Sequence, residues 1–126
     1  MDDLKQLMDD FGNEALEANT KIASVAVLLS TGKIAYQSTN WDLTKQTGVL
    51  LGILNGNTSF QLNNSKFSVS ESSAAGIIAT NPSGMGAVIL APFQRGLLVG
   101  YVMPFADPHV ALVFLIEYAT RLNGKG

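Results

Sequence analysis

Apolar residues recur along the chain with two spacings, one typical of helices and the other of strands. In residues 3–17 they fall three or four positions apart, which predicts a helix with one buried face, although Gly12 would weaken this helix or end it early. Residues 22–30 form a continuous run rich in β-branched side chains, as expected for a strand covered on both faces. A turn at Gly32 leads into a second strand over 33–38, so these two strands are expected to form a hairpin.

The pattern after this hairpin predicts one short helix followed only by strands. The helix is expected over residues 44–54, with Gly56 just beyond its end. Alternating apolar and polar positions, interrupted by turn residues, then predict strands that span residues 60–62, 67–70, 75–80, 85–92 and 97–103. Consecutive strands joined by such short turns pair in an antiparallel manner.

The last element is expected to be a long helix with an unusually apolar surface. Asp107 and Pro108 predict its start, because an acidic N-cap followed by Pro at the first helical position is a strong initiation signal. We expect the helix to run to Leu122 and to stop at residues 123–124. Residues 110–116 are apolar on every side, so one face can meet the sheet, another can meet the first helix, and a third is left exposed for a partner.

These elements predict a single α+β domain over residues 1–126. The expected architecture is a central antiparallel sheet of five to seven strands. The N- and C-terminal helices cover one face of this sheet, and the short helix covers the other. The sequence contains no repeat, linker or low-complexity segment.

Composition and charge exclude several classes of partner. The formal net charge is −2 and the basic residues are scattered, which argues against nucleic acid. The longest apolar run, residues 96–106, has about half the length that a membrane span requires. The chain has no cysteine, which fits a reducing compartment, and we expect a cytoplasmic protein. Apolar residues make up 47% and charged residues 14%, so some apolar surface is expected to be covered by a partner.

The sequence offers little material for catalysis. His109 is the one histidine, so a multi-histidine metal site is excluded, and no cysteine can replace it. A Ser-His-acid triad would have to use His109, which we interpret instead as an exposed imidazole at the start of the last helix. Six carboxylates on the first helix are spaced as a solvated face rather than as an acid/base pair. We therefore expect no enzyme activity and no cofactor.

Read in order, several segments of the chain resemble the profilin family, and the archaeal profilin-like proteins most. Residues 65–69 are similar to the family's Gly-Thr-Lys-Tyr strand, and a proline followed by a long closing helix completes the pattern. The other similar segments are residues 23–29 with Gly32 and Gln37-Ser38, residues 86–89 and residues 96–101. The resemblance extends over about residues 4–122 and rests on the order, the spacing and the total length together.

The resemblance implies a profilin fold and binding to monomeric actin, in the cytoplasm and as part of the cytoskeleton. The implied surface comprises the later strands and the start of the closing helix, with the residues Asn81, Ser83, Met85, Phe93, Arg95, His109, Val113 and Glu117. This chain departs from the family in the turn before Met85, where Asn81-Pro82 replaces the usual basic residues. A basic contact with acidic actin is therefore not expected there, and Arg95 is the guanidinium that remains on that side.

A second family function, the binding of proline-rich peptides, is not expected here. Profilins hold such peptides between aromatic side chains of both terminal helices and the second strand. The matching positions are Leu4, Leu7, Ala35 and Arg121, none of which is aromatic. Trp41 lies outside this set, and we interpret it as a structural plug at the entry to the short helix rather than as a ligand platform.

The alternative to a profilin is a roadblock-type scaffold that dimerises and regulates a Ras-like small GTPase. In that protein the helix over 44–54, with Gly48 and Gly52, would form the dimer face. The two families differ over residues 60–71, where a profilin has a full extra hairpin and a roadblock protein needs only a connection. They also differ in oligomeric state, since profilins are typically monomers. A small-molecule sensor of related architecture would instead require an apolar pocket with converging polar groups.

Overall fold

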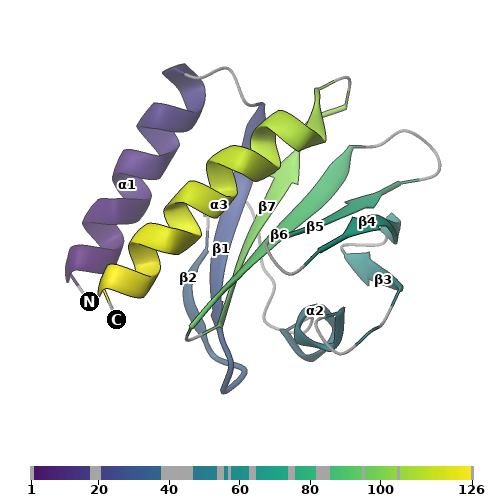
Figure 1. Cartoon of the computed structure of the whole chain (residues 1–126), viewed down its shortest axis with the longest axis horizontal. Helices are drawn as coiled ribbons and strands as arrows, with labels where there is room; N and C mark the ends of the chain where they lie inside the picture. The colour runs from purple at the N-terminus through teal and green to yellow at the C-terminus, as the bar shows by residue number, and fades with distance from the viewer. Residues whose placement is uncertain are drawn as a thin grey trace.

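The computed structural model describes residues 2–17, 21–37, 47–53, 56, 58–62, 65–73, 76–81, 86–94, 96–104 and 106–125. Its elements, in chain order, are α1 (Asp2–Glu17), β1 (Ile22–Leu29), β2 (Ile34–Gln37), α2 (Thr47–Ile53), β3 (Ser59–Leu62), β4 (Ser65–Ser72), β5 (Ile77–Thr80), β6 (Ala87–Phe93), β7 (Gly96–Val102) and α3 (Pro108–Lys125) (Figure 1). This order agrees with the α-β-β-α-β-β-β-β-β-α arrangement predicted from the sequence.

The strands form one antiparallel sheet in the order β2-β1-β7-β6-β5-β4-β3. The last strand, β7, lies inside the sheet, between β1 and β6, so it joins the first hairpin to the later strands. β1 pairs with β7 from Ile22, opposite Val102, to Leu29, opposite Gly96. The β1–β2 connection turns at Gly32, whose φ of 93° is a conformation that glycine adopts without strain. The predicted α+β class is confirmed.

Alternating side chains along the strands pack into two separate hydrophobic cores, one on each face of the sheet. On β1, Val25 and Val27 belong to the core beneath α1 and α3, whereas Ala26 and Leu28 belong to the core beneath α2. This period of two follows from the pleat of a strand. Figure 1 shows α1 and α3 lying side by side across one face, with α2 beside β3 on the other. The predicted layer arrangement is therefore confirmed.

Residues 59–72 form the extra hairpin that distinguishes the two families considered above. β3 pairs with β4 so that Phe60 lies opposite Phe67. The two rings are stacked, with centroids 5.6 Å apart, and both are buried. A mere connection is what a roadblock protein requires in this region, so the hairpin favours the profilin resemblance.

α1 has the predicted extent, whereas α3 ends later than predicted. α1 continues through Gly12 to Glu17, because Gly12 lies on the exposed face, where a missing side chain costs only about 1 kcal/mol of helix propensity. α3 continues through residues 123–124 to Lys125, because the last residues of a helix are weakly specified by its sequence. Trp41, interpreted as a structural plug, lies outside the described residues.

Candidate functional site

The N-terminal turn of α3 is fixed by Asp107. Its Oδ1 accepts a hydrogen bond from the backbone N–H of His109 at 2.9 Å, and its backbone carbonyl accepts from the N–H of Ala111 at 3.3 Å. Asp107 is thus the N-cap that the sequence predicted, with Pro108 at the first helical position. The hydrogen bond from the His109 backbone, together with the His109 ring, lowers the pKa of Asp107 below its ordinary value.

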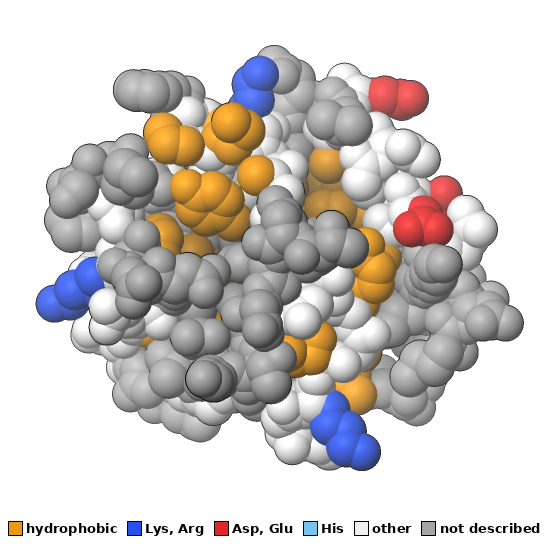
Figure 2. All heavy atoms as spheres, turned by 180° about the vertical axis from the view of Figure 1, so that it is seen from behind, with side chains coloured by type: hydrophobic (Ala, Val, Ile, Leu, Met, Phe, Trp, Pro, Cys, Tyr) orange, Lys and Arg blue, Asp and Glu red, His pale blue; other side chains and the backbone are white. Residues whose placement is uncertain are grey.

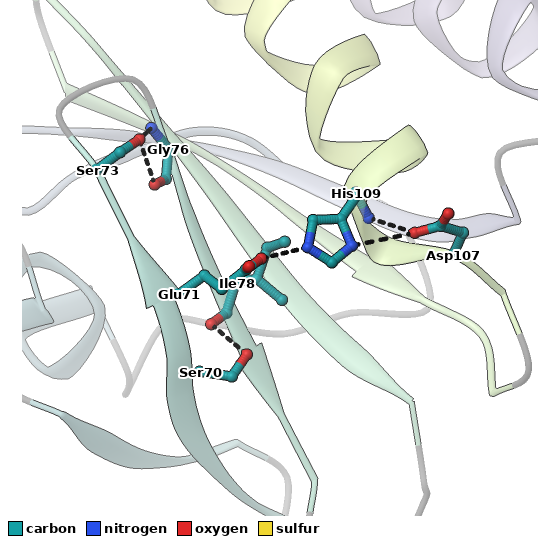
Figure 3. Close-up of polar contacts among 7 residues, drawn as sticks. All are labelled: Ser70, Glu71, Ser73, Gly76, Ile78, Asp107 and His109. Carbon is teal, nitrogen blue, oxygen red and sulfur yellow. Dashed lines mark hydrogen bonds and ion pairs between the residues drawn. The ribbon is translucent and has the colours of Figure 1, made fainter.

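His109 contacts two carboxylates, Asp107 in the turn before α3 and Glu71 on β4, and the second contact links α3 to the sheet (Figure 3). Its Nδ1 lies 3.2 Å from Oδ1 of Asp107, and its Nε2 contacts Oε2 of Glu71 on β4. These side chains are more than half exposed, at 63% for His109, 59% for Asp107 and 56% for Glu71. The hydrogen bond with Asp107 and then that with Glu71 raise the pKa of His109 above its ordinary value. The imidazole at this end of α3 is therefore a tie between two elements.

An apolar stripe lies exposed on α3 next to this tie. Val110 is 53% exposed and Val113 is 61% exposed, and together with Met103, at 49%, they are the exposed large apolar side chains of the described residues. The opposite side of the helix is buried against the sheet and α1 through Ala111, Leu115, Tyr118 and Ala119. The face left over, predicted from the apolar run over 110–116, is therefore present. Its spacing continues one turn further to the exposed Glu117.

The residues that the profilin resemblance implied do not form one compact patch. His109, Val113 and Glu117 share the solvent side of α3. Asn81 and Phe93 lie near opposite ends of β6, which at ~3.3 Å per residue is about 20 Å long. The remaining implied residues, Ser83, Met85 and Arg95, lie outside the described residues.

Asn81 and Phe93 both have a visible structural role. The side-chain amide of Asn81 donates to the backbone carbonyl of Lys66 at 2.9 Å, which ties the end of β5 to β4. Phe93 is half-buried against the core beneath the terminal helices and pairs with Gly96 across the β6–β7 turn. Among the described residues of the implied surface, Val113 on α3 is the large apolar side chain that is more than half exposed.

The positions that the profilin resemblance matched to the family's proline-rich peptide site lie where α1, α3 and β2 approach one another. Leu7 is buried, Ala35 is half-buried against the same core, and Arg121 is exposed. The side chain of Leu4 lies outside the described residues. Aliphatic and basic side chains at these positions do not provide the row of flat rings on which a polyproline helix stacks.

Arg121 instead takes part in a network between the terminal helices. Its guanidinium lies 4.5 Å above the ring of Tyr118 and its Nη1 is 3.3 Å from Oε1 of Glu14. The hydroxyl of Tyr118 donates to that same oxygen. This hydrogen bond lowers the pKa of Glu14, while burial and Glu14 raise the pKa of Tyr118. The network joins α1 to α3 next to the Phe11 and Phe114 rings, which contact each other and Tyr118.

The described residues contain no cluster of three or more His, Cys, Asp or Glu that could hold a metal ion. Among the same residues, no helix is both long and apolar enough to cross a membrane. The described part of α3 displays exposed valines flanked by carboxylates and one imidazole.

Two residues of this surface, Val110 and Glu71, differ in how well the sequence predicts them. Val110 lies in the apolar run that predicted an exposed face, and its three-residue spacing from Val113 was the available signal. Glu71 gave no such signal. It is 38 positions before His109 and lies in a serine-rich strand, so only the tertiary packing of α3 on the sheet brings the two side chains together.

Comparison with known proteins gives a consistent result. No protein-family model matches the chain. The chain is 30% identical over 131 residues to Loki profilin-1 of Lokiarchaeum sp. (strain GC14_75), with 95% of each chain covered. It is 32% identical over 103 residues to Odin profilin of Odinarchaeota yellowstonii (strain LCB_4), with 81% of this chain and 86% of that protein covered.

A solved structure is similar over the whole chain. LokiProfilin1, crystallised in complex with rabbit actin, matches with a TM-score of 0.90 at 27% identity, covering 100% of this chain and 98% of that one. The layers, the sheet and both terminal helices described above are thus shared with a protein whose structure has been solved with a partner bound.

Proposed function

Since this chain belongs to the profilin family, we propose that it binds monomeric actin in the cytoplasm and regulates the assembly of actin filaments. The support comes from relatives that are named profilins and that match this chain over nearly their full length, and from a structural neighbour that was crystallised with rabbit actin. The proposed activity is binding rather than catalysis.

The observation that carries this proposal is the pair of exposed valines on α3. Val110 and Val113 offer apolar area that the fold itself does not use. Glu117 and His109 flank them on the same side of the helix, so the patch has an apolar centre with a polar rim. Protein interfaces are commonly built in this way, because the centre supplies desolvation and the rim supplies orientation. We propose the outward face of α3 (His109, Val110, Val113 and Glu117) as the centre of the actin-binding surface.

The other implied contacts stay predictions. Asn81 and Phe93 would extend the surface toward the ends of β6, and their tying contacts leave only their exposed parts for a partner. Ser83, Met85 and Arg95 are proposed from the family resemblance alone.

We further propose that the protein acts as a monomer and does not bind proline-rich peptides in the family's usual way. The second point is supported by Leu7, Ala35 and Arg121, which stand where aromatic rings would be needed. Arg121 is also engaged with Glu14 and Tyr118, so a peptide at this place would have to displace an existing contact.

A polymerisation assay tests the proposal. Increasing amounts of the protein are added to monomeric actin from the organism that encodes it, and assembly is followed by light scattering. We expect a longer lag before spontaneous assembly, and co-elution of the two proteins as a one-to-one complex in size-exclusion chromatography. An unchanged lag together with separate elution would refute the proposed function. Elution of the free protein as a dimer would refute the proposed monomer.

A further inference from the structure

Both ring nitrogens of His109 face carboxylate oxygens. Nδ1 faces Asp107, in the turn that starts α3, and Nε2 faces Glu71 on β4 (Figure 3). A carboxylate oxygen can only accept a hydrogen bond, so each of the two contacts requires an N–H on the imidazole. A neutral imidazole carries one N–H, whereas the imidazolium carries two. The geometry therefore fits the protonated form, in which both contacts are hydrogen bonds between opposite charges.

The surroundings of His109 favour this form. In the described part of the chain, the charged groups that face it are Asp107, from its own helix, and Glu71, from the sheet. The positive end of the α3 dipole opposes a cation at this position. Two carboxylates in direct contact outweigh this effect, in accordance with the raised pKa of His109.

Loss of the proton has unequal effects on the two contacts. Asp107 also accepts from the backbone N–H of His109 at 2.9 Å, so the cap remains whatever the state of the ring. The remaining ring N–H can serve only one of the two carboxylates, and Asp107 is held next to the ring by the cap. The contact expected to fail is the one with Glu71, which is the link that joins the first turn of α3 to β4.

This link lies at the edge of the apolar stripe on α3. Val110 follows His109 directly, and Val113 is one helical turn further on. A second contact already holds this part of the helix close to the sheet: a Cβ placed on Gly76 would lie 2.8 Å from Cδ1 of Leu112. Residues 108–110, which precede the buried Ala111, are therefore the part of α3 whose position depends most on the link to Glu71.

We propose that Glu71 is a positioning residue of the actin-binding surface, which holds the first turn of α3 through the protonated ring of His109, so that binding weakens when this ring loses its proton. The inference rests on the function proposed above. The sign follows from linkage: the contribution of the tie is complete at pH values below the pKa of His109 in the unfolded chain. It is lost as the pH rises through the higher pKa of the folded state.

The first experiment measures the tie itself and requires no partner. His109 is the one histidine of the chain, so its ring signal in an NMR titration is unambiguous. We expect its titration midpoint to lie above the ordinary range of histidine, and to fall in Glu71→Gln. Glu17→Gln removes the same charge from an exposed position on α1 and serves as the matched control, with an unchanged midpoint. Equal midpoints in wild type and Glu71→Gln would overturn the proposal.

The second experiment measures binding to monomeric actin at about pH 6 and about pH 9, on either side of the histidine titration. Because actin itself responds to pH, the informative quantity in each variant is the ratio of two dissociation constants, the one at about pH 9 divided by the one at about pH 6. We expect this ratio to be larger in wild type and Glu17→Gln than in Glu71→Gln, by on the order of two- to five-fold, the range of a solvent-exposed ion pair.

The outcomes separate this inference from the function on which it rests. Equal ratios in wild type and Glu71→Gln, with clear binding, would refute the positioning role of Glu71 and leave the proposed function standing. Absence of a complex at every pH would refute the proposed function, and the effect of pH on binding with it.

Discussion

The substitution Val113→Asp tests the proposed surface at its most exposed apolar residue. Val113 is 61% exposed on the outward face of α3, so little of its side chain contributes to the fold. Complete burial of a valine side chain stabilises by about 1.5 kcal/mol, and covering the exposed part in a complex therefore contributes about 0.9 kcal/mol, a factor of about five in affinity. The aspartate removes this gain and adds the cost of desolvating a carboxylate, so we expect affinity to fall by at least about ten-fold.

Isothermal titration calorimetry with monomeric actin measures this change, and thermal unfolding checks that the fold is intact. An exposed substitution of this type changes stability by less than about 0.5 kcal/mol, so the melting temperature should be unchanged. Asn13→Asp introduces the same side chain at an exposed helical position on α1 and should bind like wild type. If Val113→Asp also binds actin like wild type, the outward face of α3 is not the binding surface.

Three further predictions concern the scaffold that carries this face. Leu115→Ala should lower the free energy of unfolding by about 2–5 kcal/mol in denaturant titration, because Leu115 is fully buried between α3 and the sheet; a smaller loss would show that the site collapses around the cavity. Gly96→Ala should destabilise the fold by about 1–3 kcal/mol or more in the same assay, since a Cβ at this position would overlap the carbonyl oxygen of Leu28 on the neighbouring strand. Wild-type stability of this variant would mean that β1 and β7 separate easily. Glu14→Gln should lower stability near neutral pH but not in acid. The pKa of Glu14 is lower in the folded state, so the contribution of this carboxylate to stability is present above the unfolded pKa and is lost as the pH falls through the folded pKa. Parallel curves of stability against pH for the variant and the wild type would contradict this.

Much of the fold could be predicted because local pattern and tertiary burial agree. Residues 22–30 read as a strand covered on both faces, and β1 does lie between α1 and α3 on one side and the α2 core on the other. Asp107 and Pro108 predicted the start of α3 through a cap that depends only on neighbouring backbone. The end of α3 was predicted too early, because an Asn-Gly pair is a weak signal for the end of a helix, and α1 likewise continues through Gly12.

The candidate site was predictable only where its residues share one element. The profilin resemblance implied Val113, Glu117 and His109, helical spacing places them on one side of α3, and the leftover apolar face was visible in residues 110–116. The strand order could not be predicted in this way, because β7 inserts between β1 and β6 through pairings that no local pattern encodes. Glu71 was missed for this reason.

The face of the sheet opposite α1 and α3 is the main competitor for a binding role. Figure 2 shows apolar side chains visible on it between segments that are not described, and the half-buried Ile34, Val69 and Tyr101 pack against the core on this side. These three side chains contribute to that core, whereas Val110 and Val113 expose more than half of their surface on α3. We therefore expect the partner to bind at α3.

Hydrogen–deuterium exchange of the chain with and without monomeric actin compares the two faces in one measurement. Amides and flanking segments that a partner covers exchange more slowly, and peptides from every element are followed together. We expect slower exchange in the first half of α3, residues 108–117, and no change in α2, residues 47–53. Slower exchange in α2 with α3 unaffected would place the partner on the opposite face and contradict the account.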